Sequence, residues 1–408
     1  MASNTFLTIS QITYESAMLL KNSLKLGSRV NRQYDSQFAR MGAKIGQTVS
    51  IRKPPRFVIR RGATAQFQGI TEQFTTLTLA QAGVDLNYTS SDMTLSMDNF
   101  RRRYLDPAIA TVANDIDQQG MLLYNQIPWM IGTPGVVPNA LLTYMQAGAI
   151  LSEEAAPRDE NRSLMLNPLS MATIANANTA LFNPQTTIGE QYRSALMSQA
   201  AGWMWYEDQN VTTHTVGPLG GTPLVDGAGQ TGSSLLTKGW TMAAALRLRR
   251  GDAFTIDNVF AVNPQSRLSQ GRLRRFVVTA DVSSTAGGAA TIPIYPALTP
   301  PNLDSTPAQF QTVNSSPADS AAITVIGTAN TISPQNLGFH RDAITLAVVD
   351  MDIPRGAVEV ERVSDEDSGI SIRIVHYYDG TNDVSGARLD VLYGWSLIYP
   401  EICVRIAS

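Results

Sequence analysis

The stretch DNFRRRYLDPAIATVANDIDQQGMLLYNQI, from Asp98 to Ile127, predicts a long helix around which the rest of the chain is organised. Its apolar side chains recur at intervals of three, four or seven residues, which places them on one face of an α-helix. These apolar positions are Leu105, Ile109, Val112, Ile116, Leu123 and Ile127. Asp106 suits the cap, Pro107 the first helical position, and Pro128 the end. From Pro107 to Ile127 such a helix measures about 30 Å.

Three consecutive arginines, Arg101, Arg102 and Arg103, stand at the leading end of this helix. Positive charges at a helix N-terminus oppose the helix dipole, so they do not serve helix stability. Two interpretations remain open at this point. The run is either a solvated surface or a contact site for something outside the helix.

Length and composition indicate a globular protein of two or three domains with a substantial core. The chain has 408 residues, of which 43% are hydrophobic and only 16% charged. A surface rich in uncharged polar groups suits contact with other protein as well as with water. The net charge of −3 gives no basic surface for tight binding of nucleic acid.

Cys403 is the only cysteine, so neither an intrachain disulfide nor a cysteine metal cluster is possible. Its apolar neighbours, Ile402 and Val404, predict a buried and unreactive thiol. The N-terminal sequence lacks the pattern of a signal peptide, and no apolar run is long enough to span a membrane. We therefore expect synthesis in a cytoplasm and no membrane partner.

The N-terminal quarter predicts an amphipathic helix at 10–26 and then a long β-hairpin at 46–89, whose polar tip is 60–73. A lone hairpin is only marginally stable in water, so this one needs support that another subunit could supply. The hairpin is locally basic. Its charged side chains are Arg52, Lys53, Arg56, Arg60 and Arg61. They form either a solvated face or a surface that docks on acidic groups of a neighbour.

The remainder of the chain alternates helical and β-prone segments. Helices are predicted at 141–154 and 167–181, and short strands at 204–206 and 211–216. From Gly217 to about Thr299, short β-prone runs separated by glycine and proline predict a small all-β insert. A proline-rich linker follows. The last strands are expected at 344–349, 358–363, 370–377, 389–395 and 402–406.

No pattern of catalytic, cofactor-binding or metal-ligating residues is found, so we predict no such site and no cofactor. His214, His340 and His376 lack the spacing of a zinc helix site and are expected to be structural. Arg250-Gly251-Asp252 is expected to be a turn between strands. The acidic groups at Asp350, Asp352 and 365–367 do not match a calcium loop. These absences make an enzyme the weaker hypothesis.

Three segments together resemble the major capsid (coat) proteins of tailed bacteriophages. They are FTTLTLAQAGVDLNYTSSDMTLS (74–96) running into RRRYLDPAIATVANDID (101–117), then LMLNPLSMATIANANTALFNP (164–184) followed by AAGWMWYEDQNVTTHTVG (200–217), and LYGWSLIYPEICVRI (392–406). The closest likeness is to the subgroup typified by the coat protein of short-tailed Salmonella phages, which carries an inserted β-barrel domain.

This resemblance implies an α+β chain with the Hong Kong 97 capsid fold. The parts expected from it are an N-terminal arm (1–45), an extended loop (46–89), a peripheral domain (90–160) with a spine helix (98–127), the first part of an axial domain (161–216), an inserted β-barrel-like domain (217–300), a linker and return (301–338), and the C-terminal axial and peripheral strands (339–408). The apolar face of the spine helix would form core, and the basic residues of the loop would make contacts between subunits.

The same resemblance implies a function in the virion capsid, as the subunit that assembles into the icosahedral head. Expected partners are copies of the chain in hexamers and pentamers, a separate scaffolding protein, a portal protein, packaged double-stranded DNA bound without sequence specificity, and a decoration protein. Assembly is expected in the host bacterial cytoplasm. Two alternatives stay open: the shell of an encapsulin-like cellular nanocompartment, and a β-rich carbohydrate-binding protein.

Overall fold

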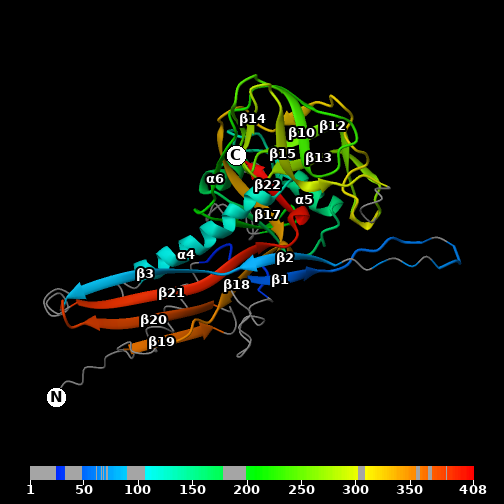
Figure 1. The fold of residues 1–408 in the computed structure, drawn as a ribbon. Coiled ribbons are helices and arrows are strands. Elements are labelled where there is room, and N and C mark those ends of the chain that lie inside the picture. The colour runs from blue at the N-terminus through cyan, green and yellow to red at the C-terminus, as the bar shows by residue number, and fades with distance from the viewer. Residues whose placement is uncertain are drawn as a thin grey trace, which may run out of the picture. The chain divides into compact units, whose positions relative to one another are not determined.

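A computed structural model provides the structure of the chain (Figure 1). It describes residues 24–32, 48–60, 62–65, 67, 69, 72–89, 106–177, 199–301, 308–354, 359–365, 370–382 and 384–408. The described chain is a mixture of α and β structure that divides into two compact units. The first contains Met1–Ile51, Thr75–Gly120 and Ile344–Ser396, and the second Arg52–Phe74, Met121–Ala343 and Leu397–Ser408.

The first unit is built on a five-stranded sheet with the order β18-β21-β20-β19, in which β3 also pairs with β21. The strands are β3 (Ala80–Thr89), β18 (Ile344–Val349), β19 (Glu359–Asp365), β20 (Ile370–Asp379) and β21 (Val384–Leu397). Strands β19, β20, β21 and β3 run side by side in antiparallel pairs (Figure 1). The predicted hairpin of the last strands, 358–377, is confirmed as the β19–β20 pair.

Helix α4 (Asp106–Met121) packs its apolar stripe in the first unit. Ile109, Val112 and Ile116 are each at most 3% exposed. The helix is tied to β21 because the Tyr393 hydroxyl donates to the Asp115 carboxylate at 2.7 Å, and the Trp395 indole N–H donates to a backbone carbonyl of the helix at 2.9 Å. The indole therefore lies close against the helix backbone.

The long helix was predicted to continue to Ile127, and this part of the prediction is wrong. The α-helix ends at Met121, and Leu122–Gln126 form a 3-10 helix. Pro128 cannot supply a backbone N–H, and the segment before it tightens into the i→i+3 pattern. Leu123 is buried, but in this 3-10 segment and within the second unit. Leu105, like the rest of 98–105, lies outside the described residues.

The predicted amphipathic helix at 10–26 also lies almost wholly outside the described residues, which begin at Leu24 with a turn. Asp117 of α4 holds this turn by accepting the backbone N–H groups of Lys25 at 2.6 Å and Gly27 at 3.0 Å. Asn31 then forms a parallel bridge to Thr345, at the start of β18. A single helix carboxylate thus positions the beginning of the described chain.

The β-hairpin is shorter than the predicted 46–89. It consists of β1 (Thr48–Lys53) and β2 (Gln73–Thr78), and the described residues 54–60 form no strand. Pro54 and Pro55 follow β1 directly and lack the N–H groups that pairing needs. Residues 80–89 do not return along the hairpin, because they form β3 and pair with β21 from Ala80↔Tyr393 to Thr89↔Val384. Sequence alternation identified the strand but not its partner.

The second unit contains a sheet with the order β4-β22-β17-β5-β7-β6, and β8 pairs with β17. Its elements are β4 (Met130–Ile131), α5 (Leu141–Glu153), β5 (Arg162–Leu166), α6 (Pro168–Ala177), β6 (Gln199–Ala200), β7 (Trp203–Glu207), β8 (Thr213–Thr215), β17 (Ile332–His340) and β22 (Cys403–Ala407). The core around Trp129, Tyr144, Trp203 and Trp205 is buried against the helices. Helices α5 and α6 and strands β7, β8 and β22 were predicted, whereas the central strand β17 was not.

The all-β insert also belongs to the second unit. It is built of short strands, as its sequence indicates, but its sheet includes β16, which lies beyond the expected end at residue 300. Its main sheet has the order β16-β12-β13-β15-β10-β9 and closes on itself through a bridge between Leu224 and Ala322. The strands are β9 (Gly221–Val225), β10 (Gly232–Trp240), β11 (Ala245–Leu248), β12 (Ala253–Val262), β13 (Ser269–Val278), β14 (Val282–Ser284), β15 (Ala290–Leu298) and β16 (Ile323–Val325). Strands β11 and β14 form a separate pair. The stacked rings of Phe254 and Phe276 lie in its core.

Candidate assembly interface

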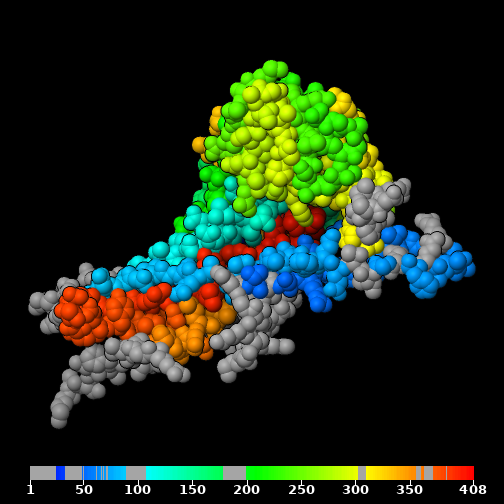
Figure 2. Space-filling model, in the orientation of Figure 1, coloured from blue at the N-terminus to red at the C-terminus, as the bar shows by residue number. Residues whose placement is uncertain are grey.

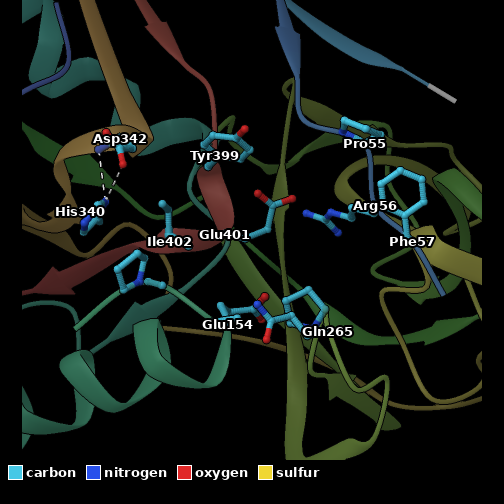
Figure 3. A pocket seen from close by; sticks show the side chains of 14 residues that line it. Pro55, Arg56, Phe57, Glu154, Gln265, His340, Asp342, Tyr399, Glu401 and Ile402 are labelled. Carbon is cyan, nitrogen blue, oxygen red and sulfur yellow. Dashed lines mark hydrogen bonds and ion pairs between the residues drawn. The ribbon is translucent and has the colours of Figure 1, made fainter. Parts of the chain in front are cut away.

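The root of the hairpin, residues 54–57, forms one wall of a pocket of about 470 Å³ in the second unit (Figure 3). The other walls come from the residues after α5, from the turn between β12 and β13, and from the segment between β21 and β22. The side chains that face the pocket include Pro55, Arg56, Phe57, Glu154, Pro157, Pro264, Gln265, His340, Asp342, Tyr399, Glu401 and Ile402. His340 and Asp342 come from the end of β17 and the turn after it, so apolar and charged groups from five segments line the pocket.

Glu154, which lines the pocket, belongs to a buried ion pair beneath it. Nη1 of Arg274 on β13 lies 2.6 Å from Oε1 of Glu154, and both side chains are at most 3% exposed. The indole N–H of Trp129 donates to the same carboxylate oxygen at 3.1 Å, and the guanidinium of Arg274 lies 5.0 Å from the Trp129 ring centroid. Burial raises the pKa of Glu154, and the charge of Arg274 opposes that rise. The insert is therefore joined to the sheet core by buried charge.

A second carboxylate, Glu401, lies near this pair at the floor of the pocket. Its Oε1 accepts a hydrogen bond of 2.9 Å from the hydroxyl of Tyr295 on β15. Burial and the negative charge of Glu401 both raise the pKa of Tyr295 well above its usual value, so the hydroxyl stays protonated and can donate. This contact occupies Oε1 of Glu401, and Glu401 is also one of the residues that line the pocket.

The basic side chains predicted for intersubunit contact are partly engaged within the chain. Arg52 lies 3.5 Å from Glu72 across the hairpin, and both are exposed. The Lys53 ammonium group lies 5.6 Å from the Tyr399 ring centroid. Burial lowers the pKa of Lys53, with Glu401 opposing the shift. Arg60 donates to the carbonyl oxygens of the hairpin tip at 62 and 64. Arg61 lies outside the described residues.

Arg56 differs from these neighbours. Its side chain is half-buried and makes no hydrogen bond or ion pair with the residues that the structure describes. In Figure 3 it points toward Glu401 across the pocket. The predicted basic cluster is therefore not one surface, since its members face the hairpin, the pocket or solvent.

The hairpin also carries exposed apolar side chains that sequence analysis overlooked. Phe57, Ile59, Phe67 and Phe74 are 58%, 85%, 98% and 69% exposed. In the view of Figure 2, described residues of the hairpin beyond Lys53 lie at the surface. Phe57 and Ile59 stand at alternate positions beside a proline pair in the sequence. The predicted contact surface was nevertheless based on the positive charges around them. Several large apolar groups exposed along one arm indicate a protein contact surface.

Other exposed apolar side chains lie on separate elements. Tyr377 and Tyr378 at the end of β20 are 43% and 53% exposed, and the ring of Tyr377 covers Gly386, where even a Cβ atom would clash with it. In the second unit, Leu142 and Met145 on α5 are more than half exposed, and so is Leu169 on α6. These positions offer further surface for contact between subunits.

The turn Arg250-Gly251-Asp252 between β11 and β12 forms the root of the insert, as a turn was predicted. Asp252 is buried, lies 2.8 Å from Nε2 of His214 and accepts the backbone N–H of Gly217 at 3.1 Å. The fully buried Arg405 donates to the carbonyl of Gly251 at 2.8 Å. The tripeptide is thus occupied in joining the insert to the sheet core.

Within the described residues, no group of three or more His, Cys, Asp or Glu side chains could hold a metal ion. Across the same part of the chain, no helix combines the length and apolar character needed to cross a membrane. Cys403 is fully buried, and burial raises the pKa of its thiol well above the usual range. His340 lies 3.1 Å from the Asp159 carboxylate.

The described residues combine a helix packed on a five-stranded sheet, a β-hairpin, a second sheet with two helices, and a closed β insert. The model of the family described as "P22 coat protein - gene protein 5" matches residues 1–406, and the chain belongs to this family. In a comparison with curated protein sequences, none matches the chain.

Solved structures similar to this chain include other phage proteins. One titled "Mycobacterium phage Che8" has a TM-score of 0.47 and 12% identity over 94% of this chain and 90% of that one. The "Asymmetric unit of bacteriophage PhiM1 mature capsid" has a TM-score of 0.44 and 9% identity over 89% and 82%. The "CUS-3 coat protein I-domain" has a TM-score of 0.20 and 24% identity over 26% of this chain and 94% of that one.

Family membership establishes the function at a coarse level. The chain is the major capsid protein of a tailed bacteriophage, and it assembles into the multimeric shell of the virion. The two alternatives, a cellular nanocompartment shell and a carbohydrate-binding protein, are set aside by this match over nearly the whole chain.

Proposed function

We propose that the hairpin β1–β2 is the arm by which one subunit holds the next in an icosahedral shell of hexamers and pentamers. The exposed apolar side chains from Phe57 to Phe74 carry this proposal, because burying such groups is the main source of affinity between proteins. The basic residues of the hairpin, Arg52, Lys53, Arg56, Arg60 and Arg61, would set the orientation and rate of this contact more than its affinity. Repetition of modest contacts around a closed shell then gives large total stability.

The parts of the capsid fold are assigned as follows. The extended loop corresponds to residues 48–79, since 80–89 join the five-stranded sheet. This sheet and helix α4, as spine helix, form the peripheral domain, and the sheet around β17 with α5 and α6 forms the axial domain. The insertion domain is the β-barrel from β9 to β16. The described start of the chain, held by Asp117, would continue from an N-terminal arm.

Other partners follow from the task of enclosing a genome. A separate scaffolding protein would guide assembly in the host bacterial cytoplasm, a portal protein would occupy one vertex, and a decoration protein could cover the outside. The packaged double-stranded DNA would be contacted without sequence specificity. The net charge of −3 supports weak contact with the DNA. A strongly basic surface would bind many phosphates and would resist movement of the DNA during packaging. The role is structural, with no catalytic step.

Removal of the hairpin tip tests the proposal. We expect a chain in which 60–72 are replaced by a short glycine turn to fold as a monomer but to form no shells, measured by light scattering and electron microscopy. The matched control shortens the exposed insert loop at 227–232, which lies outside the proposed arm. Shells of normal size and yield from the tip deletion would rule out the proposed role of the hairpin.

A further inference from the structure

Two side chains of opposite charge face one another at the hairpin root without forming an ion pair. Arg56 and Glu401 point toward each other across the pocket, as Figure 3 shows. Within the described part of the chain, Arg56 has no hydrogen-bonding partner, and Oε2 of Glu401 accepts no hydrogen bond. A half-buried guanidinium that faces a free carboxylate oxygen gains by moving onto it, since such pairs form strong, charge-assisted hydrogen bonds.

The two sides of the pocket differ in how firmly they are held. On the floor, Glu401 is fixed by Tyr295, next to the buried pair of Arg274 and Glu154. On the other side, the root itself contains Pro54 and Pro55, and the described residues 54–60 form no strand. Its contacts include a hydrogen bond of 2.8 Å from Arg267, in the turn between β12 and β13, to the carbonyl of Phe57. The floor is therefore tied by buried charged contacts, whereas the root lacks strand pairing.

The space between them allows that movement. The pocket measures about 470 Å³ and is lined by apolar groups on both sides, among them Phe57 on the root and Tyr399 and Ile402 on the floor. Phe57 is 58% exposed, so closing the pocket would remove apolar surface from water as well as joining the charges. In the position observed, the Arg267 guanidinium donates to the carbonyl of Phe57 at 2.8 Å.

We propose that the hairpin root is a two-position latch, in which closing the pocket brings Arg56 onto Glu401 and re-aims the hairpin. A shell of hexamers and pentamers requires one sequence to meet its neighbours at more than one angle, and a joint with two discrete positions meets that need. The inference goes beyond the proposed role of the hairpin because it concerns a single chain. It is therefore tested on the free subunit, whether or not the hairpin joins subunits.

The test measures distances between spin labels on Ile59→Cys, two residues beyond the root, and Glu160→Cys in the exposed loop after α5. The native thiol Cys403 is buried with a raised pKa, so the labels attach to the introduced cysteines, and the unsubstituted protein gives the labelling blank. We expect two distance populations in the full-length free subunit. Glu401→Gln should deplete the closed population while its amide oxygen still accepts the Tyr295 hydroxyl.

Comparing the single substitutions with the double substitution shows whether Arg56 and Glu401 act through one shared interaction. Arg56→Gln should deplete the same population, and the double substitution should do no more than either alone, because both remove one interaction. Glu153→Gln, a carboxylate-to-amide change on the neighbouring Arg272 pair, should leave the populations unchanged. A single population that is indifferent to Glu401→Gln would overturn the latch, and so would independent effects of the two substitutions.

Discussion

Arg274 and Glu154 form a buried ion pair whose nitrogen and oxygen lie 2.6 Å apart, and this pair joins strand β13 of the insert to the residue that follows helix α5. Around it, Asn263 and Gln270 donate side-chain hydrogen bonds of 2.7 and 2.9 Å to the carbonyl of Glu153. That carbonyl belongs to the last turn of α5, where helix carbonyl groups lack partners of their own. The insert thus completes the end of a helix in the sheet core.

Removing one member of this pair should destabilise the whole second unit. Arg274→Ala leaves Glu154 buried without its cation, which costs about 3–5 kcal/mol of unfolding free energy. Arg272→Ala is the control, since its pair with Glu153 is about one-third exposed and is expected to contribute at most about 1 kcal/mol. Denaturant unfolding of the free subunit measures both. Equal losses for the two substitutions would show that burial of the first pair does not matter.

Low pH should lower the stability of the first unit, because it protonates the carboxylate of Asp390 on β21. Burial alone would raise the pKa of this carboxyl, but hydrogen bonds from Arg373 at 2.6 Å, Arg388 at 2.8 Å and Gln81 at 3.0 Å outweigh it and lower the pKa. A group whose folded pKa is depressed stabilises the folded state above its unfolded pKa of about 3.9, and this stabilisation is lost as the pH falls through the folded value.

The free energy of unfolding should therefore fall below about pH 4. In Asp390→Asn this part of the fall should be absent, and the stability at neutral pH should be lower because the arginines lose their anion. Denaturation curves from pH 2 to 7 provide the measurement. An unchanged acid limb in the variant would mean that other carboxyl groups carry the effect.

Gly120 near the end of α4 is expected to tolerate no side chain. Alanine favours a helix over glycine by about 1 kcal/mol. Here, however, its Cβ would lie 2.6 Å from Leu26 and 2.7 Å from the Trp395 ring, which is held by its hydrogen bond to the helix. Overpacking of this kind costs about 1–3 kcal/mol, so Gly120→Ala should destabilise overall.

The control for this substitution is Gly148→Ala in α5, where the nearest atom would be 3.3 Å away. It should cost less than Gly120→Ala, because a shift of a few tenths of an ångström relieves the contact. Denaturation followed by tryptophan fluorescence compares the two. A stabilised Gly120→Ala variant would show that the indole can move aside.

Sequence patterns predicted those elements whose own residues show a clear apolar periodicity. The apolar stripe of α4, the alternation of β18 and β20, and the short β-prone runs of the insert were all visible in the sequence. Strand β17 was missed because its residues Ser333, Gln335 and Asn336 are polar, although all three are buried. Asn336 satisfies its amide by donating to the carbonyl of Ile406 and accepting the N–H of Asn167. Because the hydrogen-bond partners of this buried polar side chain are distant in the sequence, no local pattern reveals that the strand is buried.

The candidate site was less predictable for the same reason. The charges of the hairpin were evident, but their partners were not, since Lys53 lies over Tyr399 and Arg56 faces Glu401, more than three hundred residues away. The exposed apolar side chains were equally hidden, because composition does not tell whether a phenylalanine is covered. Only the fold shows that Phe67 is almost fully exposed.

The final prediction separates the apolar from the charged contribution of the hairpin to assembly. Phe67→Ser should slow shell formation at every salt concentration, because burying a phenylalanine contributes roughly 1.5–3 kcal/mol and is not screened. Arg60→Glu should slow it mainly at low salt, since exposed ion pairs contribute about 0–1 kcal/mol and weaken within a Debye length of about 10 Å at 0.1 M. Light scattering at low and high salt measures both rates.

Neither substitution should change the unfolding of the free subunit, because both side chains lie on the exposed hairpin. Met242→Ser is the matched control: Met242 is 82% exposed, but it lies in the insert, outside the proposed arm. If Met242→Ser delayed assembly as much as Phe67→Ser, loss of any exposed apolar group would explain the result. If high salt abolished the effect of Phe67→Ser, charge rather than apolar burial would dominate the contact.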